Sequence, residues 1–154
     1  MQTSAEEVDG LAMQDYPFAY LSAIHRPHFV NMSKALRPFG ITPQMWRVLA
    51  VLVEADGRSV GDLAGLTATE RSNLTRILSE MEDAGLVFRN AMERDKRFAQ
   101  VFVTEAGRAK HQAVLPAVRA QYDFALRGFS HAEMRALVGF LRRMKQNLGH
   151  QDAL

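Results

Sequence analysis

The sequence predicts a mainly α fold with one small β-hairpin. Apolar residues recur at steps of three and four over most of the chain, and this spacing places them on one side of a helix. Two short β-prone runs, at residues 86–88 and 100–103, flank a polar loop, which is typical of a hairpin. A chain of 154 residues that is 47% hydrophobic has the size of one domain and enough apolar content to fill a core.

The composition excludes several kinds of site. The chain contains no cysteine, so disulfides, thiolate metal sites and cysteine redox sensing are excluded. Its first residues are acidic and polar where a signal peptide would be basic and then apolar, and no run of about 18 apolar residues occurs. The net charge of +2 is too small to indicate a partner. We therefore expect a cytoplasmic protein without a membrane span, with a flexible tail at residues 1–15 and another tail at 148–154.

The first two helices are expected on either side of a proline-containing turn. In the first, at residues 16–37, Pro27 is expected to kink the helix or to mark its true start. Pro38 disfavours helical geometry at the residue before it, so the helix should end there. The second helix opens with Thr42 as N-cap and Pro43 at its first position.

A short helix is expected next, at residues 60–64. Ser59 and Asp62 have capping-box spacing at its start. Gly65 is expected to open a tight turn that leads into a longer helix.

The longer helix, at residues 70–84, is the most regular in the chain. Thr67 paired with Glu70 three residues later, or Thr69, is expected to cap it, and Gly85 to end it. One narrow stripe should be buried, formed by Leu74, Ile77, Leu78 and Met81.

The opposite face of this helix carries side chains that can read DNA. Two helices joined by a brief turn form a helix-turn-helix, whose second helix places its N-terminal residues against base edges in the major groove. Arginine can bind guanine with two hydrogen bonds, asparagine can bind adenine, and serine or threonine can bond bases or phosphates. From this helix alone, an ordinary solvated face is an equal alternative. The candidate contacts are Arg71, Ser72, Asn73, Thr75, Arg76 and Ser79.

The hairpin that follows adds a wing to this pattern. Its charged tip can lie along or into the minor groove, where arginine binds well. Asp95 is expected to brace an arginine by a charge-assisted hydrogen bond. The wing candidates are Arg94, Asp95, Lys96 and Arg97. Thr104 then caps a long helix.

Two amphipathic segments, at residues 108–128 and 130–148, close the chain. Ser130 and Glu133 have capping-box spacing at the start of the second. Three helices outside the winged unit are more than a DNA-binding domain of about 90 residues needs. A second copy of the chain, related by two-fold symmetry, is the commonest partner that buries such apolar faces, so a homodimer is expected. Packing within one chain is the alternative.

The order of these elements resembles the MarR family of bacterial winged helix-turn-helix regulators. The likeness extends over residues 16–147 through TPQMWRVLAVL, SVGDLA, SNLTRILSEMEDAGLV and ERDKRFAQVFVTEAGRA, and its most specific part is the D-x-R signature at Asp95–Arg97. It implies one domain, with a winged helix part at 42–104 and dimerisation helices at 16–40 and 105–147. It also implies a homodimer on a pseudo-palindromic operator and a repressor released by a small aromatic or phenolic acid. Glu70 and Arg71 stand where the family more often has Asp and Lys or Pro.

Aromatic and cationic residues around the first helix could hold such an acid, although residues of these types are also common in a plain core. The candidates are His25, Arg26, His28, Phe29, Met32 and Trp46.

The sequence also allows other hypotheses about function. His25, His28 and His111 could bind zinc, and the regulator could be constitutive. The winged helix could instead bind only protein. No metalloprotease, nucleophile-elbow or phosphate-loop motif occurs, so neither an enzyme nor a cofactor is expected.

Overall fold

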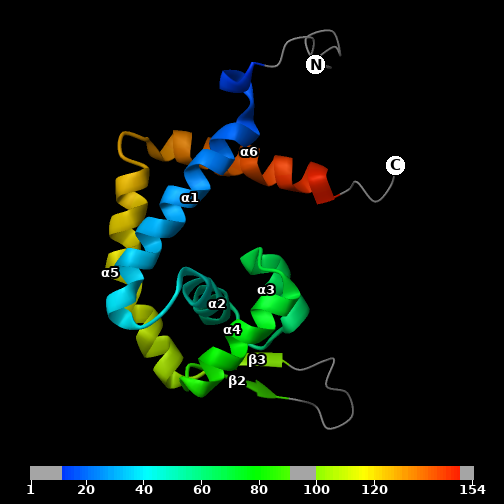
Figure 1. The fold of residues 1–154 in the computed structure, drawn as a ribbon, viewed down its shortest axis with the longest axis vertical. Coiled ribbons are helices and arrows are strands. Elements are labelled where there is room, and N and C mark those ends of the chain that lie inside the picture. The colour runs from blue at the N-terminus through cyan, green and yellow to red at the C-terminus, as the bar shows by residue number, and fades with distance from the viewer. Residues whose placement is uncertain (1–11, 91–99, 150–154) are drawn as a thin grey trace. The chain divides into compact units, whose positions relative to one another are not determined.

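The computed structural model describes residues 12–90 and 100–149 and shows a mostly helical chain with a small antiparallel sheet (Figure 1). In chain order the elements are η2 (Met13–Asp15), α1 (Pro17–Leu36), η3 (Arg37–Phe39), α2 (Pro43–Glu54), β1 (Arg58–Ser59), α3 (Val60–Thr67), α4 (Arg71–Asp83), β2 (Val87–Asn90), β3 (Gln100–Val103), α5 (Glu105–Ala125) and α6 (His131–Gly149).

The chain divides into two compact units. The first ends at Gln121 and the second begins at Tyr122, so the division falls inside α5. Residues 1–11 and 150–154, which make up most of the predicted tails, lie outside the described residues. In the described part of the chain, no helix is long and apolar enough to cross a membrane.

Helix α1 has its predicted extent, ending at Leu36 with Arg37 as C-cap, and it shows how the chain accommodates the two prolines. It runs through Pro27, so this residue does not mark the start of the helix. Arg37 has helical dihedral angles, φ −51° and ψ −42°, although it precedes a proline. The chain accommodates Pro38 by tightening into the 3₁₀ turn η3, which Gly40 ends with a φ of 72°.

The turn between α3 and α4 also lies elsewhere than predicted. Gly65 is inside α3, which continues to Thr67, and Ala68 takes the left-handed conformation with φ 49°. The predicted threonine cap of α4 is wrong, because Glu70 is the N-cap and makes no capping hydrogen bond through its side chain. The Thr67 hydroxyl instead donates to the Leu63 carbonyl within α3, at 2.7 Å.

Most of the other predicted caps are confirmed. Thr42 caps α2 and accepts from the Met45 amide at 3.2 Å. Ser59 and Asp62 form the capping box of α3. Gly85 ends α4 in a Schellman motif, in which the Leu86 amide donates to the Met81 carbonyl at 2.8 Å.

The sheet contains one strand more than the predicted hairpin. Its strand order is β1-β3-β2, and both pairings are antiparallel. The additional strand β1 is two residues long and pairs Arg58 with Val101. Asp56 secures this edge, because its carboxylate accepts from the amides of Gly57 and Val103, each at 3.0 Å.

The core lies in the first unit. Helices α1 to α5 and the sheet all contribute, and Leu36, Leu49, Leu63, Leu74 and Val101 are completely buried. The predicted stripe of α4 is confirmed, since all four of its residues are buried.

Helix α6, in the second unit, has no buried residue among those described. Ser130 and Glu133 form the predicted capping box at its start, with 2.8 Å between the Ser130 amide and the Glu133 carboxylate. Apolar side chains on α6 remain exposed, including Val138, Phe140 and Leu141.

Candidate nucleic-acid interface and ligand cavity

Helix α4 presents a continuous polar face opposite its buried stripe. Asn73 is half-buried, and the other five candidate contacts on this helix are exposed. The fold therefore brings together on one surface all six residues that the sequence indicated: Arg71, Ser72, Asn73, Thr75, Arg76 and Ser79.

Hydrogen bonds between neighbours fix several of these side chains. The Arg76 guanidinium donates to the Asn73 amide oxygen at 2.9 Å and forms an ion pair with Glu80, one turn later. The Thr75 hydroxyl donates to the Arg71 carbonyl at 2.9 Å. Thr75 thus keeps oxygen lone pairs for an incoming donor, and Arg76 and Asn73 are oriented as a pair.

Sequence reasoning missed the contact that connects the wing to α4. Glu82, near the end of the helix, accepts from Arg89 of β2 through the backbone amide at 2.9 Å and through Nε at 2.8 Å. The Arg89 guanidinium also donates to the Ser79 hydroxyl at 2.9 Å. The hydrogen bonds from Arg89 hold the pKa of Glu82 below its ordinary value, despite partial burial that acts to raise it. Spacing along the sequence gave no signal of this contact, because a helix and a strand supply the two partners.

The predicted wing tip falls between the two described strands of the hairpin. Arg94, Asp95, Lys96 and Arg97 lie outside the described residues. The strands that lead to the tip are described, and they pair in register from Val87 opposite Val103 to Asn90 opposite Gln100.

A cavity lies between α1 and α2 where the sequence placed a ligand. Its volume is about 220 Å³. Five of the six candidate residues line it, and Arg26, which is exposed, does not. The lining residues are His25, His28, Phe29, Met32, Pro43, Trp46 and Arg47.

The indole of Trp46 packs against the imidazole of His111, which lies on α5. The two rings stack with centroids 5.0 Å apart and planes inclined by 16°. His111 is only 9% exposed, and within the described residues its Nδ1 atom has no hydrogen-bond partner. Burial lowers the pKa of His111, so the ring is neutral at pH 7 and acts as an apolar support for the indole.

The zinc alternative finds no support in this geometry. The described residues contain no group of three His, Asp or Glu side chains close enough to hold a metal ion. His111 packs on Trp46 and does not join His25 and His28 as a ligand set.

Comparison with known proteins identifies the family. The model of the MarR family matches residues 39–97. The transcriptional activatory protein BadR of Rhodopseudomonas palustris is 34% identical over 124 residues, which are 78% of this chain and 71% of that protein. The chain belongs to the MarR family.

A further relative agrees in sequence, and a solved structure agrees in fold. The homoprotocatechuate degradative operon repressor of Escherichia coli is 30% identical over 101 residues, 66% of this chain and 68% of that protein. A crystal structure of a MarR regulator from Silicibacter pomeroyi superimposes with a TM-score of 0.78 at 29% identity, covering 88% of this chain and 92% of that one. The chain is therefore a transcriptional regulator of a DNA-binding, non-enzymatic family.

Proposed function

We propose that this chain is a homodimeric repressor that binds a pseudo-palindromic operator and is released by a small aromatic or phenolic acid. The observation that carries the proposal is the exposed polar face of α4, opposite a fully buried stripe. A helix buried along one side and rich in Arg, Asn, Ser and Thr along the other has the form needed to enter a major groove.

The DNA contacts divide into two groups. Asn73 and Arg76, oriented by their mutual hydrogen bond, read base edges, and Arg71, Ser72, Thr75 and Ser79 contact bases or phosphates. The wing residues Arg94, Lys96 and Arg97 contact the backbone or the minor groove, with Asp95 bracing an arginine. The Glu82–Arg89 contact holds the wing strand at a fixed angle to α4.

Dimerisation uses the apolar surfaces of the terminal helices. Phe18, Leu21 and Ile24 of α1 are exposed in the single chain, as are the apolar residues of α6. Exposed apolar groups in such numbers favour a second copy as cover, and closed two-fold dimers are the commonest arrangement. MarR regulators dimerise, which supports the same conclusion.

The effector site is the cavity beside Trp46. Its volume of about 220 Å³ suits a single aromatic ring, and two histidines and Arg47 line it together with apolar groups. Among the structural neighbours, CouR of Rhodococcus jostii was solved with p-coumaroyl-CoA, and DNA binding by BpsR of Bordetella bronchiseptica is regulated by 6-hydroxynicotinic acid. The relative from Escherichia coli is a repressor, which supports repression, whereas BadR is an activator.

Salt-dependent binding and footprinting test the DNA part of the proposal. The full chain should protect a pseudo-palindrome whose half-sites are about 10 base pairs apart, or a multiple of that. Its affinity should fall with rising salt, because phosphate contacts release counterions. Protection of a single half-site would contradict the dimer, and salt-independent or absent retardation would favour a module that binds only protein.

Fluorescence of the single tryptophan tests the effector part. Benzoate, salicylate and cinnamate are titrated while Trp46 emission is followed, with and without operator DNA. Binding should quench Trp46 fluorescence. Operator DNA should lower the affinity for the acid by the same factor by which the acid lowers the affinity for operator DNA. Equal titration curves with and without DNA would mean binding without regulation. The absence of any response would leave Trp46 as part of the core.

A further inference from the structure

The carboxylate of Asp56 lies where strand β3 leads into helix α5. Its Oδ1 atom accepts from the backbone amides of Gly57 and Val103, each at 3.0 Å, and its Oδ2 atom accepts from the Arg108 guanidinium at 2.7 Å. One side chain therefore connects the end of α2, the last residue of β3 and the first turn of α5. All of these residues belong to the first unit of the chain.

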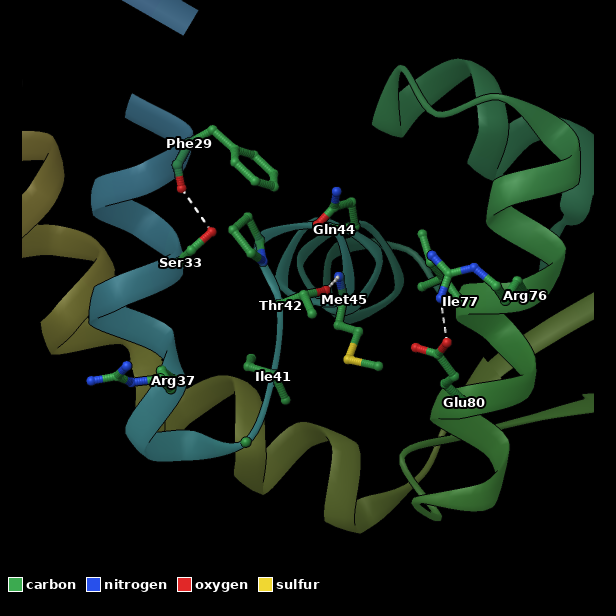
Figure 2. Close-up of a pocket in the computed structure, with 12 residues that line it drawn as sticks. Phe29, Ser33, Arg37, Ile41, Thr42, Gln44, Met45, Arg76, Ile77 and Glu80 are labelled. Atoms are coloured by element: carbon green, nitrogen blue, oxygen red, sulfur yellow. Dashed lines mark hydrogen bonds and ion pairs between the residues drawn. The ribbon is translucent and has the colours of Figure 1, made fainter. Parts of the chain in front are cut away.

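Helix α2 gives Asp56 a fixed base. Thr42 caps the start of this helix by accepting from the Met45 amide (Figure 2). Leu49 of the same helix is completely buried in the core. The helix cannot shift without disrupting these contacts, so the carboxylate that follows its end is held at a defined place in the fold.

Strand β3 packs closely against the turn that carries Asp56. Gly57 has a φ of 69°, and a Cβ atom on it would lie 2.9 Å from the Phe102 ring. Strand β3 is also the central strand of the sheet, since it pairs with both β1 and β2. A displacement of β3 at this point would therefore move the hairpin that carries the wing tip.

The hairpin is held at its base by two carboxylates, one for each strand. Glu82 of α4 binds β2 through Arg89, and Asp56 binds β3 through Val103. Arg108 completes the second contact, because its charge keeps the Asp56 carboxylate from turning away into solvent. The Arg108 and Asp56 side chains are 41% and 31% exposed, so their ion pair contributes little stability and acts mainly by orienting the carboxylate.

We propose that Asp56 is a positioning residue for DNA binding, which fixes the direction of the wing by holding strand β3 against α2 and α5. The proposal rests on the wing contacts with DNA that are proposed above. An arginine at the tip of a hairpin binds a phosphate or a minor-groove edge only where the hairpin places it correctly, and a small rotation at the base becomes a larger displacement at the tip. Loss of the Asp56 contacts should therefore weaken DNA binding, although no group that touches DNA is removed.

The sign of this effect distinguishes positioning from simple electrostatics. Asp56→Ala removes a negative charge, which by itself should strengthen binding to DNA because the protein becomes more positive. We expect the opposite result for this variant. The matched control is Glu54→Ala, which removes an exposed acid at the end of α2 and should bind operator as tightly as the parent or more tightly.

Operator affinity of the full chain over a range of salt concentrations tests the proposal. Asp56→Ala should weaken binding several-fold and flatten the slope of log affinity against log salt by up to about one unit, as the loss of one phosphate contact does. In the background of Arg97→Ala, which removes a wing contact, Asp56→Ala should add little further loss, because both changes act through the wing. Arg108→Met should lose part of the affinity, and Arg108→Lys, which keeps the charge, should recover most of that part.

Two outcomes would overturn the assignment. Operator binding by Asp56→Ala that is as tight as that of Glu54→Ala would leave the carboxylate no part in placing the wing. Equal losses from Asp56→Ala in the parent and in the Arg97→Ala background would mean that Asp56 acts on the whole protein and not through the wing. Urea unfolding identifies a variant that has lost its fold. If Asp56→Ala is such a variant, Arg108→Met and Arg108→Lys decide, and equal affinities of these two would reject the proposal.

A measurement without DNA separates this proposal from the proposed function. Hydrogen exchange of the Val103 amide, followed by NMR on the full chain, reports whether Asp56 holds β3. Exchange should be roughly tenfold faster in Asp56→Ala than in the parent, because the amide loses a charged acceptor. An unchanged exchange rate would overturn the proposal even if DNA binding were weakened. Absence of salt-dependent DNA binding by the unaltered chain would instead reject the proposed function, whatever the exchange rate of Val103.

Discussion

Glu82→Gln should destabilise the protein by loosening the wing from α4. The change keeps the shape of the side chain and removes its charge, while three donors on Arg89 still point at it: the backbone amide at 2.9 Å, Nε at 2.8 Å and Nη2 at 2.5 Å. Hydrogen bonds to a charged group contribute about 1.5–3 kcal/mol, against about 1 kcal/mol for neutral ones. The Glu82 side chain is 29% exposed, so solvent screening lowers the expected loss to about 1–2 kcal/mol.

Thermal and urea unfolding measure this loss. At about 2–4 °C per kcal/mol for a chain of this size, Tm should fall by roughly 2–8 °C. Both proteins must be compared at one concentration, because the stability of a dimer depends on it. The matched control is Glu80→Gln on the same helix, whose exposed ion pair predicts a loss below about 0.5 kcal/mol.

The pH dependence gives an independent check. The folded-state pKa of Glu82 lies below its ordinary value of 4.5. Its contribution is therefore complete above pH 4.5 and is lost as the pH falls through the lower, folded-state pKa. The difference between the parent and Glu82→Gln should be constant from pH 7 to pH 5.5 and shrink below pH 4.5. Equal losses in Glu82→Gln and Glu80→Gln, or a difference that grows in acid, would refute this reasoning.

Three further predictions concern packing, burial and the wing. Gly107→Ala should lower the free energy of unfolding, measured with urea, by about 1–3 kcal/mol, because the added Cβ would lie 2.1 Å from a backbone oxygen. The control is Gly65→Ala inside α3, where an added Cβ meets nothing within 4 Å, so this change should be neutral or stabilising. His111→Phe should keep the stacking on Trp46 and reduce the loss of stability below pH 6.5, since the parent must protonate a histidine whose pKa burial lowers; an unchanged pH profile would contradict this. Arg97→Ala should weaken binding to all DNA sequences and flatten the slope of log affinity against log salt by about one unit; an unchanged slope would reject the wing assignment.

Features set by neighbouring residues were predictable from the sequence. The stripe and the Schellman end of α4, the caps at Thr42 and Ser130, and the hairpin all depend on residues within a few positions of one another. The polar face of α4 follows from the same periodicity, since fixing the buried side of a helix also fixes its exposed side.

Features set by distant residues were not predictable in the same way. Strand β1 exists because Arg58 meets Val101, a partner more than forty residues away. The stacking of His111 on Trp46 likewise joins distant residues. Glu82 and Arg89 are only seven positions apart, but their contact joins a helix to a strand, so the period of neither element predicts it. Gly65 was misassigned because a glycine is a turn signal in isolation, and packing of α3 against α2 and α4 outweighs its low helix propensity.

The central claim, that α4 reads base sequence, is tested most directly by a base-by-base specificity profile. Affinities of the full chain are measured for every single base-pair change in its operator, and the measurement is repeated with Asn73→Ala and Arg94→Ala. Asn73→Ala should lose about 1–3 kcal/mol of discrimination at one position in each half-site and keep it elsewhere. Arg94→Ala should weaken binding to all sequences by the same factor. A profile of Asn73→Ala that runs parallel to that of the parent at every position would contradict the account.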